Sequence, residues 1–214
     1  GGIMLYSPAG GIEIYDASLG KMTLVKTFPA WNKEWTSVVR GGFSPNAGNN
    51  DFVFHTWRNN GYREHWTLNK QGTDLKKVYE ASSLDTIWHS MVSGRFVGNT
   101  FDDYVSYNYD TGQCYLFRGG ANELWWAEAI AGSTQPARMW SFLCPVMLRS
   151  NKGFSDSILA YSYSKQRAET MEVQSDGRLV TVKHLDNVGK WSSAAQMPNN
   201  SITRRIAFFT PLEW

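Results

Sequence analysis

The sequence lacks a strong excess of charge of either sign. Its 214 residues include 21 Lys and Arg against 19 Asp and Glu, which leaves a net charge of +2. Proteins that bind a nucleic-acid backbone or an anionic membrane surface carry a dense positive patch. The charge balance therefore argues against both, and we expect no nucleic-acid partner.

Cysteine is scarce, with Cys114 and Cys144 as the two thiols. They cannot form a dense disulfide framework, and they lack the paired spacing of a zinc site. Our strand assignment places them on the second and fourth strands of one unit, two strand spacings or about 9 to 10 Å apart. A disulfide requires Cα atoms within about 7 Å. We predict two free, largely buried thiols.

Long apolar runs are missing too, because no stretch approaches the roughly 18 apolar residues of a membrane-spanning helix. Residues 1–8 have neither the charged nor the apolar region of a signal peptide, and the opening Gly1-Gly2 is typical of a processed end. We expect no insertion into a membrane.

Catalytic motifs are absent as well. The chain contains no His-Glu-x-x-His motif, no Gly-x-Ser-x-Gly elbow and no phosphate loop. His55, His65, His89 and His184 are scattered, although His55 could meet Glu64 or His65 across neighbouring strands. A single His in a strand is more often a packed or surface residue than a base. We expect no enzyme, no catalytic residue and no cofactor.

Aromatic residues and glycine are abundant, with 10 Trp, 10 Tyr, 11 Phe and 19 Gly. Aromatic side chains favour strands, and glycine favours the turns between them. The composition predicts many short β-strands and few helices.

A repeat of Trp organises these strands. Trp35, Trp88, Trp140 and Trp191 fall at intervals of 53, 52 and 51 residues. A short strand-like run follows each of them, at residues 36–39, 89–92, 141–144 and 192–195. A period of this length indicates a repeated structural unit.

A second, more apolar run follows later in each interval, at residues 52–54, 104–107, 158–161 and 206–209, and residues 3–6 have the same character. Asp51, Asp103 and Asp156 precede three of these runs. On this basis we divide a single domain, residues 1–214, into repeats of roughly 1–50, 51–102, 103–155 and 156–204, with a closing strand at 205–210.

Each repeat supplies four strands separated by turn residues, and a small antiparallel sheet cannot bury both of its faces alone. We therefore predict an all-β fold, a β-propeller of four four-stranded antiparallel blades. The apolar run is expected to form the innermost strand, covered on both faces by adjacent blades. A β-sandwich is the alternative, but the regular Trp period argues against it.

Residues 205–210 read as a seventeenth strand beyond the sixteen of four blades. This strand could close the ring near the first blade, start a fifth blade that another chain completes, or belong to a longer propeller. We favour closure of a single ring near the termini.

Residues 88–99, leading into Asp102-Asp103-Tyr104 and Thr111-Gly112, follow the order Trp, strand, Gly-x-Phe, loop, Asp, apolar strand and Gly turn. Residues 35–51 repeat it with Gly41-Gly42-Phe43. The third copy replaces Gly-x-Phe with Pro145-Val146-Met147, and the fourth keeps little beyond Trp191. This pattern resembles the bacterial and fungal propeller repeats of the VCBS and FG-GAP kind. The resemblance implies a propeller used as a binding module, in many relatives a lectin or the adhesive part of a secreted protein.

Integrin-like relatives bind calcium in the loop before the inner strand, which needs several oxygen ligands in one short segment. Here each loop has one or two carboxylates. We expect no metal, and we predict that each Asp braces its turn by accepting hydrogen bonds from main-chain N–H groups.

The recurrent Trp residues have two interpretations. The more common role for a repeated Trp is to wedge against the neighbouring blade and bury about 150–250 Å². The functional alternative is that a Trp at the mouth of a groove stacks on the apolar face of a sugar. Other aromatic residues, including Trp57 and the adjacent pair Trp125-Trp126, exceed what the period needs, and adjacent residues in a strand face opposite sides.

These patterns predict a non-enzymatic, lectin-like propeller that is secreted and multivalent and binds glycans or glycoproteins. The predicted ligand-binding residues are Trp35, Trp88, Trp140, Trp191, Trp57 and Trp126. The alternative is a protein-binding or adhesion propeller, part of a larger secreted protein, for which self-association into a homo-oligomer is also open.

Overall fold

The computed structural model describes residues 2–7, 9–18, 20–32, 34–45, 50–58, 61–81, 88–97, 100–120, 127–129, 140–150, 153–174, 179–191, 193–197 and 205–209. These residues form 17 β-strands. Among them, no helix is long and apolar enough to cross a membrane. The all-β composition predicted from the aromatic residues and glycines is confirmed.

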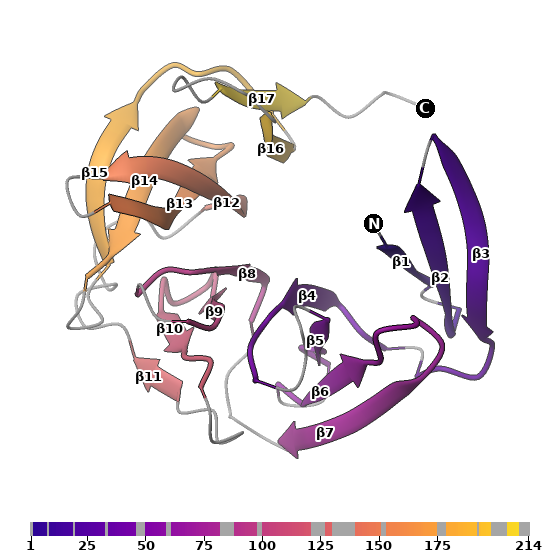
Figure 1. Ribbon diagram of the computed structural model, residues 1–214. Coiled ribbons are helices and arrows are strands. Elements are labelled where there is room, and N and C mark those ends of the chain that lie inside the picture. The colour runs from indigo at the N-terminus through magenta and orange to yellow at the C-terminus, as the bar shows by residue number, and fades with distance from the viewer. Residues whose placement is uncertain are drawn as a thin grey trace. The chain divides into compact units, whose positions relative to one another are not determined.

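The first of two compact units comprises Gly1–Ile87. It contains a three-stranded and a four-stranded antiparallel sheet, each a meander in which strands adjacent in sequence pair with one another (Figure 1). The strands of the first sheet are β1 (Gly2–Ser7), β2 (Gly11–Ser18) and β3 (Lys21–Phe28), and those of the second are β4 (Ser37–Gly41), β5 (Asp51–His55), β6 (Arg63–Leu68) and β7 (Leu75–Ala81).

The second unit comprises Trp88–Trp214 and has three sheets of the same meander type. Two have four strands, and the third has two. The strands are β8 (Ser90–Gly94), β9 (Asp103–Tyr107), β10 (Cys114–Phe117) and β11 (Ala127–Ala129), then β12 (Phe142–Ser150), β13 (Gly153–Ser162), β14 (Arg167–Val173) and β15 (Leu179–Leu185), and finally β16 (Ser193–Met197) and β17 (Arg205–Phe209).

Glycines with a positive φ lie between neighbouring strands in two of the sheets. Gly20 and Gly72, in the turns β2–β3 and β6–β7, both have φ of +74°. A side chain would strain the backbone in this left-handed conformation, whereas glycine adopts it freely. These glycines allow the chain to reverse between strands without a longer loop.

The strands occur where the sequence predicts them, but their grouping differs. The run after each Trp is the first strand of a sheet, and the apolar run is the second, so β5 pairs with both β4 and β6. The prediction that the apolar run is the innermost strand is wrong, because β5 has a paired strand on each side and so is not an edge strand of its sheet. The predicted burial of the apolar run on both faces is confirmed for β5 and β9, because all residues of these two strands are buried.

The sheets also start one strand earlier than the predicted repeats. β4, β8 and β12 open four-stranded sheets at residues 37, 90 and 142, whereas the repeats begin at 51, 103 and 156. The described residues make three complete four-stranded sheets, one of three strands and one of two. The seventeenth strand exists and pairs with β16; closure of a ring by it stays a prediction.

The Gly-x-Phe turn between the first and second strands has a packing cause. A Cβ atom at Gly41 would lie 2.5 Å from Cε1 and Cζ of the Phe43 ring, and one at Gly94 would lie 3.0 Å from Cε1 of Phe96. Both rings are buried. The glycine leaves room for a core aromatic ring to fold back over its own strand.

Aspartates fasten the same turn. Asp51 Oδ2 accepts main-chain N–H bonds from Phe43 and Ser44 at 3.1 and 3.0 Å, and Asp103 Oδ2 accepts one from Val97 at 3.2 Å. Burial raises the pKa of the Asp51 carboxyl above its ordinary value. The predicted bracing role of these aspartates is confirmed.

The third aspartate reaches a different sheet. Asp156 Oδ2 accepts the main-chain N–H of Arg95 at 2.7 Å, and the main-chain N–H of Asp156 donates to the carbonyl of Arg95 at 3.3 Å. The third repeat has lost its own Gly-x-Phe turn, and its aspartate braces the turn of the sheet before it instead.

Cys114 and Cys144 are buried thiols that form no disulfide, as predicted. Their predicted strands are wrong, because Cys114 lies on β10, the third strand of its sheet, and Cys144 lies on β12, the first strand of the next. Burial raises the pKa of the Cys114 thiol to about 12.

Candidate functional site

Three of the four periodic Trp residues share one main-chain contact. Each donates its N–H to the hydroxyl of the Tyr near the end of the apolar strand in the sheet before it. The bonds are Trp35 to Tyr6 at 3.3 Å, Trp140 to Tyr107 at 3.2 Å and Trp191 to Tyr161 at 3.0 Å. This shared contact makes the residues around the three Trp structurally equivalent.

The residue that follows Trp35, Trp88 or Trp140 joins the start of its sheet to the end of the second strand of that sheet. Its main-chain N–H donates to a carbonyl of that strand, in the pairs Thr36 to His55, His89 to Tyr107 and Ser141 to Tyr161. The side chain of the same residue accepts a second main-chain N–H bond, from the residue two positions after the one whose carbonyl it contacts. These bonds join Thr36 Oγ1 to Trp57 at 3.3 Å, His89 Nδ1 to Tyr109 at 3.0 Å and Ser141 Oγ to Tyr163 at 2.9 Å.

In each of these sheets, a buried polar side chain also bonds to the main chain of the turn that follows the second strand. Thr56, Asn108 and Ser162 are buried and directly precede Trp57, Tyr109 and Tyr163. They accept main-chain N–H bonds of the turn, from Arg58 at 3.2 Å, Asp110 at 2.9 Å and Lys165 at 3.4 Å. Local side-chain bonds of this kind hold turns in one conformation.

We call this arrangement the aromatic corner, made of the polar residue after the Trp, the buried anchor, and the aromatic residue between them in the turn. Trp57, Tyr109 and Tyr163 are 44%, 40% and 47% exposed. Three sheets thus present a large ring to solvent at the same position, on main chain that is bonded on both sides. A rigidly held, exposed aromatic ring loses little conformational entropy on binding.

Polar groups accompany each exposed ring. The guanidinium of Arg58 lies 5.4 Å from the Trp57 ring centroid, and the ammonium of Lys190 lies 5.6 Å from that of Tyr163. The Tyr109 and His89 rings are 6.0 Å apart in an edge-to-face arrangement. The rings are therefore suited to mixed apolar and polar contacts with a ligand.

The residues predicted as sugar-stacking platforms lie in different environments. Trp35 and Trp88 are buried, so their faces pack inside the protein, Trp35 stacking on Tyr62. Trp140 and Trp191 are half-buried, and Trp57 is exposed at an aromatic corner. Trp126 lies outside the described residues.

Sequence reasoning singled out Trp57 but missed Tyr109 and Tyr163. A signal was present, because the three aromatic residues are spaced by 52 and 54 residues, close to the Trp period. Trp57 and Tyr109 also stand two positions after the last residue of the strand that contains the apolar run, which is His55 for Trp57 and Tyr107 for Tyr109.

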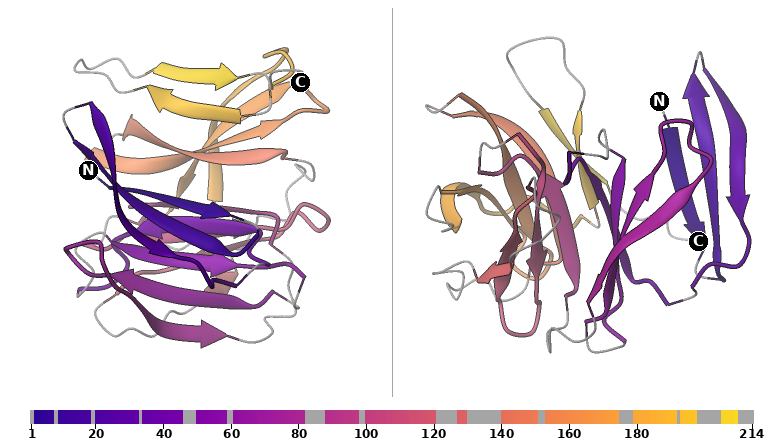
Figure 2. Two further views of the ribbon diagram at one scale, coloured as in Figure 1. Left: turned by 90° about the vertical axis from the view of Figure 1, so that its right-hand side faces the viewer. Right: turned by 60° about the horizontal axis from the view of Figure 1, so that its bottom comes forward.

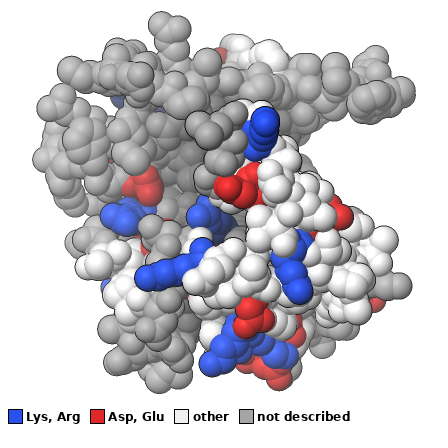
Figure 3. All heavy atoms as spheres, turned by 45° about the vertical axis from the view of Figure 1, so that its right-hand side comes forward, with Lys and Arg blue, Asp and Glu red and all other residues white. Residues whose placement is uncertain are grey.

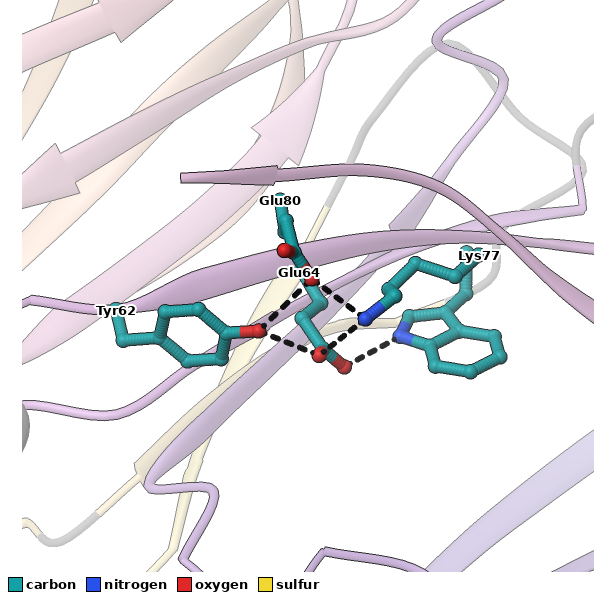
Figure 4. A network of polar contacts seen from close by, with 5 residues as sticks. Tyr62, Glu64, Lys77 and Glu80 are labelled. Carbon is teal, nitrogen blue, oxygen red and sulfur yellow. Dashed lines mark hydrogen bonds and ion pairs between the residues drawn. The ribbon is translucent and has the colours of Figure 1, made fainter. Parts of the chain in front are cut away.

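A second cluster lies on β6 and β7, where two glutamates share their partners (Figure 4). The Tyr62 hydroxyl is 2.6 Å from Glu64 Oε1 and 3.2 Å from Glu80 Oε2. The Lys77 ammonium bonds the same two oxygens, at 3.1 and 2.5 Å. The Trp66 indole N–H donates to Glu64 Oε2 at 2.9 Å.

These contacts shift the pKa values of Tyr62, Lys77 and Glu80. Burial and the bond to Glu64 raise the pKa of the Tyr62 hydroxyl, and the bonds to Glu80 and Glu64 raise the pKa of Lys77. The bond to Lys77 lowers the pKa of Glu80. Lys77 and Glu80 thus stay charged near neutral pH, and the side-chain bonds of the cluster link β6 to β7.

The histidines do not converge on a reactive group. His55 pairs directly with Arg63 across β5 and β6, and Glu64, one residue on, lies on the opposite face of the sheet. Burial, reinforced by the nearby Arg63, lowers the pKa of His65 well below 6.5. Within the described ranges no three His, Cys, Asp or Glu side chains are placed to hold a metal ion.

Positive and negative side chains are interspersed on the face of the molecule shown in Figure 3. On the face in Figure 3, described Lys and Arg side chains lie among Asp and Glu. The described part of this face therefore presents no broad field of one sign.

Comparison with known proteins shows the type of fold. No family model matches the chain, and neither does any curated protein sequence. Among solved structures, the chain is similar to Sqt1 of Saccharomyces cerevisiae, a WD40-type β-propeller, with 12% identity and a TM-score of 0.53. The match covers 86% of this chain and 47% of that chain, so the chain spans about half the length of Sqt1. The likeness and the repeated antiparallel sheets fit a propeller-like fold.

Proposed function

We propose that the chain is a non-enzymatic protein-binding module of the propeller type, and that the aromatic corners make its principal contacts. The observation that carries this proposal is the recurrence of an exposed aromatic ring, on main chain bonded on both sides, at Trp57, Tyr109 and Tyr163. Exposed Trp and Tyr rings with cationic neighbours have the composition typical of contact centres between proteins.

The recurrence also supports a multivalent contact. A single exposed ring covers little area, but each equivalent ring can engage a copy of the same ligand motif. Such a partner would present several apolar or aromatic side chains, each with polar groups at its rim. The secreted location expected from the family resemblance remains part of the proposal.

Glycan binding is the competing interpretation. Sugar stacking needs an open ring face, and Trp35 and Trp88 are buried. The corner rings are open, so a sugar could meet the same three positions. The experiment must therefore separate the two classes of ligand.

The test compares three forms of the protein. Trp57→Ser, Tyr109→Ser and Tyr163→Ser together remove the corner rings. The matched control carries Val78→Ser, Val180→Ser and Val182→Ser, at exposed positions away from the corners. Each form is immobilised and offered an extract of the source organism, and captured proteins are purified and titrated against all three. The same three forms are applied to a glycan array.

We expect the wild-type and control forms to bind the same partner, and the corner variant to bind it at least about tenfold more weakly. Equal affinity of the corner and control variants would refute the role of the corners. Glycan binding that depends on the corner rings, without a protein partner, would favour the lectin interpretation instead.

A further inference from the structure

His89 differs from its two counterparts in the aromatic corners because it can gain a proton. Thr36 and Ser141 accept the main-chain N–H of the turn with a hydroxyl, at 3.3 and 2.9 Å, whereas His89 accepts it with ring Nδ1, at 3.0 Å. A serine or threonine hydroxyl keeps one protonation state in this range, but histidine is the side chain that gains a proton between pH 5 and 8. One of the three corners therefore depends on a titratable acceptor.

The bond from Tyr109 requires the neutral form of the His89 ring. Nδ1 can accept the main-chain N–H only while it carries no proton, which places the proton of the neutral ring on Nε2. A protonated ring has an N–H group on both nitrogens, so Nδ1 would point a donor at the N–H of Tyr109. Two donors cannot form a hydrogen bond, so protonation of His89 breaks this contact.

The surroundings of His89 offer the charged ring a different partner. His89 lies just before β8 and beside the turn 108–113, which joins the neighbouring strands β9 and β10 (Figure 2, right). Its main-chain N–H donates to the Tyr107 carbonyl at 2.9 Å, which holds its backbone in place. Asp110 Oδ2 lies 3.7 Å from Nε2 and is, among the described residues, the one charged group in contact with the ring. The neutral ring thus bonds to Tyr109, and the charged ring pairs with Asp110.

The rest of the turn is held independently of His89. Asn108 Oδ1 accepts the main-chain N–H groups of Asp110 and Thr111 at 2.9 and 3.1 Å. An amide side chain does not titrate between pH 5 and 8. Protonation of His89 therefore releases the N–H of Tyr109 while the remainder of the turn keeps its bonds.

We propose that His89 makes the Tyr109 corner sensitive to acid, because protonation of its ring releases the main chain that carries the exposed Tyr109 ring. The corners at Trp57 and Tyr163, with their hydroxyl acceptors, keep their bonds. A less firmly held ring loses more conformational entropy when it binds, so contact of a partner with this corner weakens in acid. That consequence rests on the proposed function. Release of the Tyr109 N–H does not, and it is measured without a partner.

The test is NMR of the whole isotope-labelled chain from pH 8 to pH 5. A scalar coupling between the amide nitrogen of Tyr109 and Nδ1 of His89 arises only across a hydrogen bond. Hydrogen exchange at the Trp57, Tyr109 and Tyr163 amides is measured in the same samples, and each rate is corrected for the intrinsic effect of pH. His89→Ser is the matched variant, because it gives this corner the hydroxyl acceptor that Ser141 provides in another sheet. Circular dichroism verifies that both forms are folded.

We expect the coupling in the wild type at pH 8 and its loss at pH 5. Protection of the Tyr109 amide should fall about fivefold over this range, which corresponds to about 1 kcal/mol for one hydrogen bond. Protection at Trp57 and Tyr163 should stay constant. In His89→Ser, protection of Tyr109 should stay constant as well.

Three results overturn the proposal. One is equal protection of Tyr109 at pH 5 and pH 8 in the wild type, and another is a loss of protection in acid that His89→Ser shares. The third is an equal loss at all three corners, because its cause would then be general to the fold. If His89→Ser does not fold, the coupling in the wild type decides alone. A partner that binds without the corner rings would refute the proposed function and leave this measurement unaffected.

Discussion

Substitution of Gly41 by Ala tests the packing cause of the Gly-x-Phe turn. The added Cβ would lie 2.5 Å from two atoms of the Phe43 ring, and that ring is fully buried. The ring cannot swing away without breaking its own contacts, so the substitution overpacks the core. Overpacking of this kind costs about 1–3 kcal/mol. Gly120→Ala is the matched control, because a Cβ there has no neighbour within 4 Å.

The assay is urea unfolding followed by circular dichroism and Trp fluorescence. With a urea dependence of about 2 kcal/mol per molar, a cost of about 1–3 kcal/mol should lower the midpoint of Gly41→Ala by roughly 0.5–1.5 M. Gly120→Ala should leave it nearly unchanged. Gly41→Ala should cost less stability in a Phe43→Leu background than in the wild type, because the large ring is then gone. A double-mutant cycle measures this difference. Equal midpoints for the Gly41 and Gly120 variants would refute the reasoning.

Three further outcomes follow from the contacts. Because the pKa of His65 in the folded state is below 6.5, the unfolded chain binds more protons in acid than the folded chain does. Stability should therefore fall below pH 6.5 by up to about 1.4 kcal/mol per pH unit. Urea midpoints measured at two pH values should depend less on pH in His65→Gln than in the wild type. Tyr107→Phe removes the acceptor of the Trp140 main-chain N–H and should cost about 1 kcal/mol in the same unfolding assay; no change would deny that bond a stabilising role. Cys114, buried and with a thiol pKa of about 12, should react with a thiol reagent only after unfolding; rapid labelling of the native protein would contradict its placement.

The sequence predicts the elements of this fold better than their grouping. Alternating aromatic and apolar runs mark the strands, and the Trp period marks the repeat, because both are imposed by local packing. Where one sheet ends and the next begins depends on whether the apolar run pairs with the strand before it. A Gly-x-Phe turn accompanies that pairing in two sheets, and its geometry is visible only when the Phe43 ring is seen over Gly41.

The candidate site is less accessible to sequence reasoning. Trp is conspicuous in a sequence, and the four periodic Trp residues suggest a binding role, yet Trp35 and Trp88 are buried as packing elements. The exposed positions include two Tyr residues, which the composition does not distinguish from buried ones such as Tyr104. Exposure follows from the turn that carries Tyr109 and Tyr163, and that turn is fixed by bonds between residues about twenty positions apart.

The most direct measurement of the central claim is hydroxyl-radical footprinting of the protein alone and in complex with its captured partner. Oxidation at each residue is read by mass spectrometry. The account predicts that Trp57, Tyr109 and Tyr163 are oxidised readily in the free protein and are protected together in the complex, while Leu185 on β15 is oxidised equally in both. Unchanged oxidation of the three rings in a saturated complex would contradict it.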